Sequence, residues 1–387
     1  MKKITNSPKY AVVGGGCGGQ AIAAYLASKG YDVSLYNRSE KRIDHVMNTG
    51  FIDLDGCLKG RGKLSYVGTD MKRALEGRDV IMVVTTADAH KGIAQKMSPY
   101  LRDNQIILLN PGRTCGALEV DYTLRKNGCK GKPVVGEANT LIYASRVMKP
   151  GVATIKGVKN EVSTAALRAK DTKKITSKIN KVYPQFVPAE TFLETSLGNI
   201  GAIFHPTITI LNKDKIYGGQ GFDYYVEGVT DEVAEYIDLV DKEFMEVSRK
   251  LDSRPLSVKE WLNSRYSIPL SETGKMMREN PVYQGIKDPG TLDHRYLWED
   301  IPTGLVPISE FGKCLGVETP VTDFLIKEGS EILQRNFRVE GRIPETLGLS
   351  RDNLKEDIQR IIWPKIFKIT QENYYPFGMD NYPLIGS

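Results

Sequence analysis

A glycine-rich turn near the N-terminus limits most strongly what this chain can fold into. The segment GGGCGG follows the β-rich run YAVV and precedes the helix-prone run QAIAAYLAS. Gly14, Gly16 and Gly19 fit the spacing G-x-G-x-x-G, and Gly18 lies between them. Such glycines turn a strand sharply into a helix and bring backbone N–H groups against a pyrophosphate. The alternative is a turn without a ligand, but the flanking strand and helix favour a dinucleotide site.

The pattern that follows the turn alternates β-rich and helical stretches up to about residue 190. The β-rich runs include YDVSLYN, DVIMVVTT, QIILLN and KPVVGEAN. Such alternation predicts an α/β Rossmann-type domain with a parallel sheet, which we assign to residues 1–188.

Long helical stretches such as DEVAEYIDLVDKEFMEVSRKLDS and VTDFLIKEGSEILQRNF follow, with strand candidates nearly absent. We therefore expect an all-helical domain over residues 189–387. Its last residues, ENYYPFGMDNYPLIGS, are rich in Tyr, Pro and Gly, so we expect them to form an extended tail on the surface.

The composition excludes several other classes of protein. The 387 residues are enough for two domains, and no apolar run is long enough to cross a bilayer. No signal peptide precedes the first strand, so we expect a cytoplasmic protein. The five cysteines lack any CxxC spacing, which indicates reduced thiols rather than disulfides or a metal site. A net charge of +6 is too dilute for a nucleic-acid partner.

The end of the second β-rich run bears on which dinucleotide binds. An Asp or Glu there usually accepts the ribose hydroxyls of NAD, but this chain has Asn37 and Arg38. An arginine can pair with the 2′-phosphate of NADP and stack on adenine. We therefore expect NADP as the cofactor, with NAD possible. The alternative for Arg38 is a solvated side chain beside Lys41 and Arg42.

Two further loops should line the nicotinamide half of the cofactor site. TTADAH follows the run DVIMVV, and NPGRTCGALE follows QIILLN, so both lie at the carboxyl edge of the sheet. Asp88 and Arg113 in these loops are candidates for substrate contact. Turn chemistry on the surface is an equally good explanation for both residues.

Only four histidines occur, and one of them lies in the apolar segment LGNIGAIFHPTITILN. A histidine on an apolar face is most often a core residue, so His205 needs further support. His45, His90 and His294 adjoin polar segments, and we expect all three to be solvated. Farther along, DHRYLWEDIP brings Arg295 and Glu299 to the spacing of a helical salt bridge. Asp300 could share a pocket with Arg295 only if the helix unwinds before Pro302.

Several stretches resemble the octopine/nopaline (opine) dehydrogenase family. They are NPGRTCGALE, GEANTLIYASR, GNIGAIFHP, RYLWEDIPTGLVP and GVETP, and their order along both domains also matches. The resemblance implies a Rossmann domain followed by a helical domain like the C-terminal domain of 6-phosphogluconate dehydrogenase, with the active site between them. It also implies NAD(P)H-dependent reductive condensation of an amino acid with a 2-oxo acid such as pyruvate, giving a secondary amine dicarboxylate, and the reverse reaction.

The resemblance also assigns roles to individual residues. His205 falls on the family's catalytic histidine, Asp300 on the aspartate that supports it, and Arg295 on the arginine that binds a substrate carboxylate. An imidazole can donate a proton near neutral pH, and an arginine can hold a carboxylate with two parallel hydrogen bonds. Thr140 and Ser145 are candidates for hydrogen bonds to substrate, or else cap a helix. Asn199 is a weaker candidate for the same site.

Two other functions remain open at this point. One is an NADP-dependent reductase of the ketopantoate or 3-hydroxyacid type, although such enzymes commonly use a catalytic lysine where this chain offers His205. The other is a sensor that binds NADPH without catalysing a reaction. A homodimer formed through the helical domain is possible.

Overall fold

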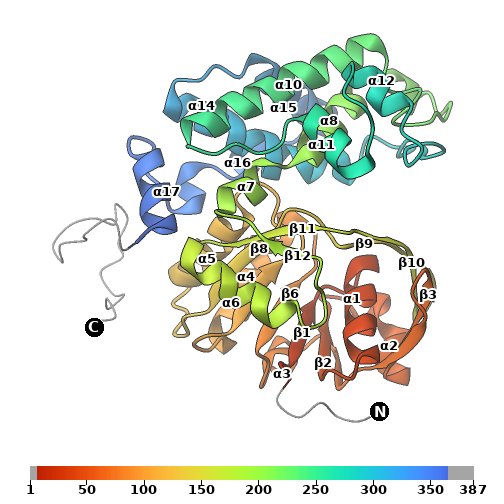
Figure 1. Cartoon of the computed structure of the whole chain (residues 1–387), viewed down its shortest axis with the longest axis vertical. Coiled ribbons are helices and arrows are strands. Elements are labelled where there is room, and N and C mark those ends of the chain that lie inside the picture. The colour runs from red at the N-terminus through yellow and green to blue at the C-terminus, as the bar shows by residue number, and fades with distance from the viewer. Residues whose placement is uncertain (1–6, 365–387) are drawn as a thin grey trace.

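The computed structural model describes residues 7–364, which form an α/β domain and a helical domain stacked on it (Figure 1). The expected surface tail at residues 372–387 lies outside the described residues. Within them, no helix is long and apolar enough to span a membrane.

An eight-stranded sheet forms the centre of the first domain, in the order β12-β11-β8-β7-β6-β1-β2-β5. All neighbours are parallel except β8 and β11, which confirms the expected parallel sheet and adds one antiparallel pair. The central strands are buried along their whole length because helices cover both faces. The strands are β1 (Tyr10–Val13), β2 (Val33–Tyr36), β5 (Tyr66–Gly68), β6 (Val80–Val83), β7 (Ile106–Leu109), β8 (Val134–Ala138), β11 (Val162–Ala166) and β12 (Phe186–Pro188).

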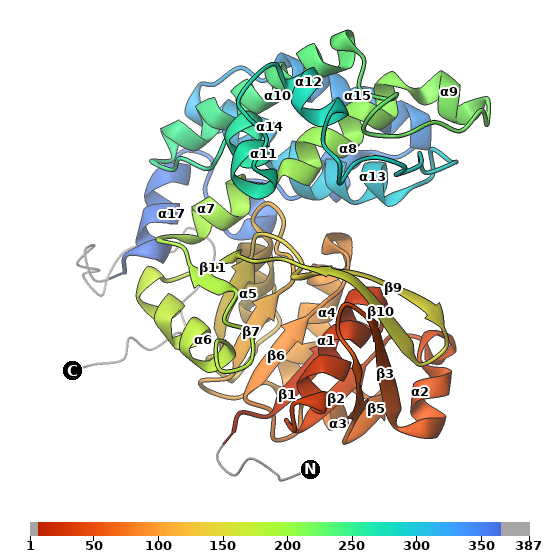
Figure 2. The same ribbon diagram turned by 45° about the vertical axis from the view of Figure 1, so that its right-hand side comes forward.

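A second, four-stranded sheet in the order β4-β3-β10-β9 was not expected from the sequence. It packs against α1, and Figure 2 shows β3, β9 and β10 on the side of the domain that carries α1 and α2. Its strands are β3 (Phe51–Gly56), β4 (Gly60–Lys63), β9 (Tyr143–Lys149) and β10 (Val152–Val158). The helices of the domain are α1 (Cys17–Ser28), α2 (Asp44–Thr49), α3 (Met71–Leu75), α4 (His90–Met97), α5 (Gly116–Lys126) and α6 (Thr172–Ile179).

The second domain is built from helices around a continuous apolar core, as expected. Its long helix α10 has an apolar face, and the Thr230 hydroxyl caps its first turn by accepting from the Val233 N–H. The helices are α7 (Phe192–Leu197), α8 (Ile200–Leu211), α9 (Lys213–Tyr217), α10 (Asp231–Lys250), α11 (Val258–Tyr266), α12 (Thr273–Arg278), α13 (Arg295–Trp298), α14 (Val306–Leu315), α15 (Pro320–Leu333), α16 (Phe337–Glu340) and α17 (Leu354–Ile362).

Arg342, just after α16, ties the helical domain back to the first domain. Its buried guanidinium pairs with Glu119 at 3.0 Å and donates to the carbonyl oxygens of Gly112 (3.1 Å) and Thr114 (2.6 Å). It also lies 3.1 Å from Nδ1 of His90. The expectation that His90 is solvated is therefore wrong, because this ring is fully buried beneath the arginine. Burial and Arg342 hold the pKa of His90 well below its ordinary value.

Candidate active site at the domain interface

The glycine turn adopts a shape that larger residues would obstruct. Gly14 has a φ of +119°, and a Cβ added to it would lie 2.3 Å from the Val84 carbonyl oxygen. A Cβ on Gly19 would lie 1.7 Å from the Gly14 carbonyl oxygen. These two glycines are therefore required by the close approach of β1, α1 and β6.

The start of α1 has the features of a pyrophosphate site. Its N-cap is Gly16, no side chain caps it, and no acidic residue lies in its first turn. The first N–H groups of this helix thus remain available to an anion. A Cβ on Gly16 would meet only Nη1 of Arg42, at 3.9 Å. The residues present fit a dinucleotide phosphate, and Arg42, considered from the sequence only as a neighbour of Arg38, adds a cation beside Gly16.

Asn37 holds the glycine turn from the end of β2. Its Oδ1 accepts from the Gly15 N–H at 2.9 Å, and its Nδ2 donates to the Ser39 carbonyl at 2.7 Å. Arg38 is exposed next to it. The amide of Asn37 therefore shapes the turn, and the exposed charges nearby come from Arg38 and Arg42.

His205 and Asp300 form a hydrogen-bonded pair at the interface. Asp300 Oδ2 lies 2.8 Å from His205 Nδ1, and the carboxylate is fully buried while the ring is 16% exposed. The Tyr225 hydroxyl lies 3.0 Å from His205 Nε2. The ring of Tyr296 stacks on the imidazole with 4.1 Å between centroids. His205 is thus fixed on both nitrogens and on one face, with part of its surface still accessible.

A break in helical geometry lets Glu299 and Asp300 point in different directions. The α-helix α13 ends at Trp298, and a π-helical turn spans Ile301–Leu305. Glu299 Oε1 accepts from the Ala87 N–H of the first domain at 3.1 Å, while Asp300 turns toward His205. The unwinding that the sequence required for a shared pocket is therefore present before and around Pro302.

Arg113 extends from the first domain to the carboxylates of Glu299 and Asp300. Its Nη1 donates to Asn199 Oδ1 at 3.0 Å, its Nε lies 3.7 Å from Glu299, and its Nη2 lies 3.6 Å from Asp300. Although burial alone would raise the pKa of Asp300, Arg113 and His205 together lower it below its usual range. The surface-turn alternative for Arg113 is wrong, because this side chain is largely buried. Asn199 is buried, and its amide binds Arg113 and Thr114.

The other predicted residues lie at various distances from this centre. Arg295 is 42% exposed and pairs with Glu299. Thr140 lies in the loop between β8 and β9, where its hydroxyl accepts from Lys159. Ser145 is buried on β9, and its hydroxyl has no hydrogen-bond partner among residues 7–364. Asp88 is exposed. Neither Thr140 nor Ser145 caps a helix, so that alternative is wrong.

Sequence reasoning missed Tyr225 and Tyr296 at this centre. Tyr225 lies in the segment IYGGQGFDYY, where nothing in the spacing distinguishes it from its neighbour Tyr224. Tyr296 directly follows Arg295, and its position at the start of a short helix gave no sign of ring stacking. The Tyr225 contact depends on how the segment before α10 folds over α8, and the Tyr296 contact on how α13 packs against α8.

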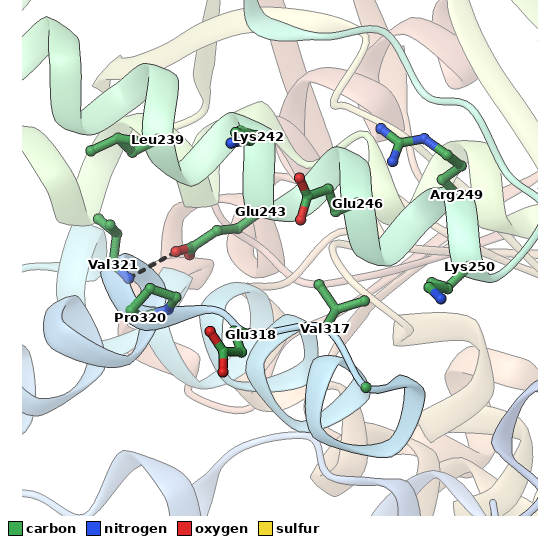
Figure 3. Close-up of a pocket in the computed structure, with 11 residues that line it drawn as sticks. Leu239, Lys242, Glu243, Glu246, Arg249, Lys250, Val317, Glu318, Pro320 and Val321 are labelled. Carbon is green, nitrogen blue, oxygen red and sulfur yellow. Dashed lines mark hydrogen bonds between the residues drawn. The ribbon is translucent and has the colours of Figure 1, made fainter.

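A groove of about 750 Å³ lies elsewhere, between α10 and the turn that joins α14 to α15 (Figure 3). Its most buried carboxylate, Glu243, accepts from the N–H groups of Val321 and Thr322, both at 2.8 Å. Glu243 therefore caps α15 and is not free for chemistry. Among the described residues, no group of three or more His, Cys, Asp or Glu side chains could hold a metal ion.

Comparison with known proteins decides the family. Residues 188–333 match the family model for the α-helical domain of NAD/NADP octopine/nopaline dehydrogenase. Residues 9–111 match the model for the N-terminus of NAD-dependent glycerol-3-phosphate dehydrogenase. The chain is also 37% identical, over 348 residues, to the opine dehydrogenase of Arthrobacter sp. (strain 1C), covering 90% of this chain and 97% of that one. The chain belongs to the opine dehydrogenase family.

Solved structures support the fold of this opine dehydrogenase. A structure of octopine dehydrogenase with NADH and L-arginine matches with a TM-score of 0.77 and 19% identity, covering 90% of this chain and 98% of that one. Yersinopine dehydrogenase with bound NADP+ matches with a TM-score of 0.72 and 16% identity, covering 92% and 99%. The protein is thus an NAD(P)-dependent oxidoreductase with the two-domain fold expected from its sequence.

Proposed function

We propose that this opine dehydrogenase joins the amino group of an amino acid to a 2-oxo acid such as pyruvate, with NADPH as reductant, and catalyses the reverse oxidation. The observation that carries the proposal is the buried carboxylate of Asp300 on Nδ1 of the accessible His205, opposite a glycine turn suited to a dinucleotide. The two reactants first lose water to give an imine. Reduction then requires a hydride on carbon and a proton on nitrogen.

His205 is the proposed proton donor. Because Asp300 accepts from Nδ1–H, the proton to be transferred is carried on Nε2, the nitrogen next to Tyr225. Reduced nicotinamide, when bound at the glycine turn, supplies the hydride. Nε2–H gives its proton to the imine nitrogen, and the neutral ring takes it back in the reverse reaction.

Asp300 and Arg113 support this donor. The carboxylate fixes the ring tautomer and stabilises the imidazolium, while the guanidinium keeps the carboxylate ionised. Asn199 acts on Arg113 rather than directly on substrate, since both ends of its amide are occupied. Arg113 and Asn199 are therefore positioning residues in this mechanism.

Arg295 is the proposed clamp for a substrate carboxylate. It is the half-exposed arginine on the same segment as Asp300, and its present partner Glu299 has a second contact with the Ala87 N–H. A planar guanidinium holds a carboxylate by two parallel hydrogen bonds, which would fix the face of the imine presented to the hydride. Thr140 is a further proposed substrate contact.

We propose NADP as the preferred cofactor. The support is the absence of an acid at the end of β2, where Asn37 binds the glycine turn, and the exposed Arg38 beside Arg42. Michaelis constants for NADPH and NADH measured side by side test this choice. A KM for NADH equal to or lower than that for NADPH would contradict it.

The reaction is tested by pairing pyruvate, oxaloacetate and 2-oxoglutarate with the common amino acids and following NADPH and NADH absorbance. We expect oxidation of the cofactor only when an amine and an oxo acid are both present. Rapid oxidation without any amine would favour the ketopantoate-type reductase instead. Cofactor binding without turnover of any pair would favour the sensor.

The proposal also covers the domain boundary, the location in the cell and the oligomeric state. We set the domain boundary between residues 188 and 189, supported by the end of β12 and the start of α7. We propose a cytoplasmic location, supported by five free cysteines, and a homodimer through the helical domain, supported by exposed Leu239 and Phe324. Cell fractionation and sedimentation velocity test the last two.

A further inference from the structure

Lys159 has no role in the mechanism above, yet the fold holds it firmly. Its ammonium donates to the hydroxyl of Thr140, and its backbone N–H donates to the Ile142 carbonyl at 2.9 Å. The residue after β10 is thus tied at two points to the loop between β8 and β9. The Thr140 hydroxyl accepts from Lys159 and keeps its own proton to donate elsewhere.

The loop that carries this pair touches the cofactor turn. Leu141 follows Thr140, and its Cδ2 lies 2.7 Å from the point where a Cβ on Gly18 would stand. A larger residue at position 18 would therefore collide with the Thr140 loop. Thr140 and Lys159 are accordingly next to the part of the first domain that holds the dinucleotide.

The ammonium of Lys159 lacks an acidic partner. The positive charges of Arg113 and Arg265 repel the ammonium. The carboxylates near these arginines are already paired with them, since Arg113 faces Glu299 and Asp300, and Arg265 lies 3.6 Å from Glu161. Across residues 7–364, no carboxylate forms an ion pair with Lys159. Its side chain is nevertheless open to solvent, so a small anion can reach it.

We propose that Lys159 and Thr140 bind the carboxylate of the 2-oxo acid, an inference that rests on the proposed function. The carbon that accepts the hydride is the former keto carbon, and it bears this carboxylate directly. The carboxylate must therefore lie beside the cofactor, on the first domain. The amino acid is attached through nitrogen and extends toward Arg295 on the helical domain, so the two acid groups of the product have separate cationic partners.

The protonation state of Lys159 adds a pH dependence. Neighbouring protein atoms displace much of the water around the ammonium although the residue keeps an exposed surface, and the charges of Arg113 and Arg265 add to this effect, so that the pKa of Lys159 falls to about 8. The charged form predominates below that pH and disappears above it. The KM for the oxo acid should therefore rise as the pH increases past about 8. In Lys159→Arg, which stays charged, this rise should be absent.

The direct test compares Lys159→Met with Lys156→Met, a matched control at an exposed lysine of the same hairpin. Loss of a charge-assisted hydrogen bond should raise the KM for the oxo acid by about 10-fold to 100-fold. The KM values for the amino acid and for NADPH should stay unchanged, as should all constants in the control. An unchanged KM for the oxo acid, or a rise in the KM for the amino acid instead, would overturn the proposal.

A binding measurement separates failure of this subsite from failure of the proposed function. Pyruvate is titrated calorimetrically into each protein saturated with NADP+, which requires no turnover. Weaker binding in Lys159→Met than in Lys156→Met supports the subsite even if no amine and oxo-acid pair reacts. Equal binding in the two variants, or no binding to the wild-type protein, would overturn it.

Discussion

The glycine turn lies within the first domain, whereas the His205 cluster is shared by both domains, and the two sites are built in opposite ways. The turn is one contiguous segment whose backbone makes the site, and its glycines remove side chains from it. The cluster gathers side chains from the loop after β7, from α8, from the segment before α10 and from the π-helical turn. A local site tolerates change elsewhere, whereas an assembled site depends on the contacts that hold the domains together.

The largest expected effect is that of His205→Ala on catalysis. Loss of a general acid should lower kcat by about 10²-fold to 10⁴-fold. The KM for NADPH should stay within about twofold, because the glycine turn is on the other domain and does not contact this ring. Steady-state kinetics check both values. Near-normal turnover would show that His205 is not the proton donor. A large rise in the KM for NADPH would show that the His205 cluster also affects cofactor binding at the glycine turn.

Arg342→Met tests how far the assembled site depends on the contact between the domains. The variant leaves Glu119 as a buried, unpaired carboxylate and frees the carbonyls of Gly112 and Thr114 on either side of Arg113. We expect a loss of about 3–5 kcal/mol in the free energy of unfolding, measured in urea.

The control for that variant is Arg335→Met. Arg335 forms an exposed pair with Glu340, so its loss should cost no more than about 1 kcal/mol. Equal effects of the two substitutions would show that Arg342 has no special part in joining the domains.

Glu137→Gln probes a buried acid beneath the Arg113 loop. Glu137 accepts from the Ala117 N–H at 2.9 Å and from the Thr195 hydroxyl at 3.0 Å, and burial raises its pKa to about 7. Between pH 4.5 and 7, Glu137 is therefore protonated in the folded protein but ionised in the unfolded chain. The free energy of unfolding of the wild type accordingly falls as the pH rises from 4.5 toward 7. Without a charge, glutamine can accept from the Ala117 N–H through its amide oxygen and donate from its amide N–H to the Thr195 hydroxyl, whose own proton then goes to the Phe192 carbonyl.

We accordingly expect Glu137→Gln to be the more stable protein at pH 8, by about 3 kcal/mol at most, with little difference near pH 5. Thermal unfolding of both proteins at the two pH values measures this. A difference independent of pH would show that Glu137 is charged throughout.

Arg38→Ser should have the smallest effect and should be confined to the glycine-turn side. Loss of one exposed contact to a 2′-phosphate should raise the KM for NADPH about 10-fold. The KM for NADH and the kcat should not change. Steady-state kinetics with the two cofactors measure this. An equal rise for both would assign Arg38 to the pyrophosphate, and no rise for either would show that it makes no cofactor contact.

The same contrast explains what could be predicted from the sequence. The βα unit around Gly14 and Gly19 was predictable because its sequence motif is one continuous segment. Each of these glycines is required by a close backbone contact within that unit or with the neighbouring strand. The helical character of α10 was predictable from its apolar period. The four-stranded sheet was not, because its two hairpins, β3–β4 and β9–β10, are far apart in the chain and only partly buried.

The His205 cluster was predictable only in part. Residue type and family resemblance selected His205, Asp300 and Arg295, but spacing alone argued against a shared pocket for Arg295 and Asp300. The end of α13 at Trp298 breaks the helix between these two residues, and it follows from tertiary packing that no local pattern reveals. Burial of His90 was missed for the same reason, since Arg342 is 252 residues away in the chain.

The central claim is that Asp300 acts on the reaction through His205. A double-mutant cycle of His205→Ala and Asp300→Asn, read as kcat/KM for the productive pair of substrates, tests it most directly. We predict that the double variant is about as slow as His205→Ala alone, because the asparagine has no ring left to orient. If the two losses instead multiply, so that the double variant is slower by the product of both factors, Asp300 acts independently of His205 and the account is contradicted.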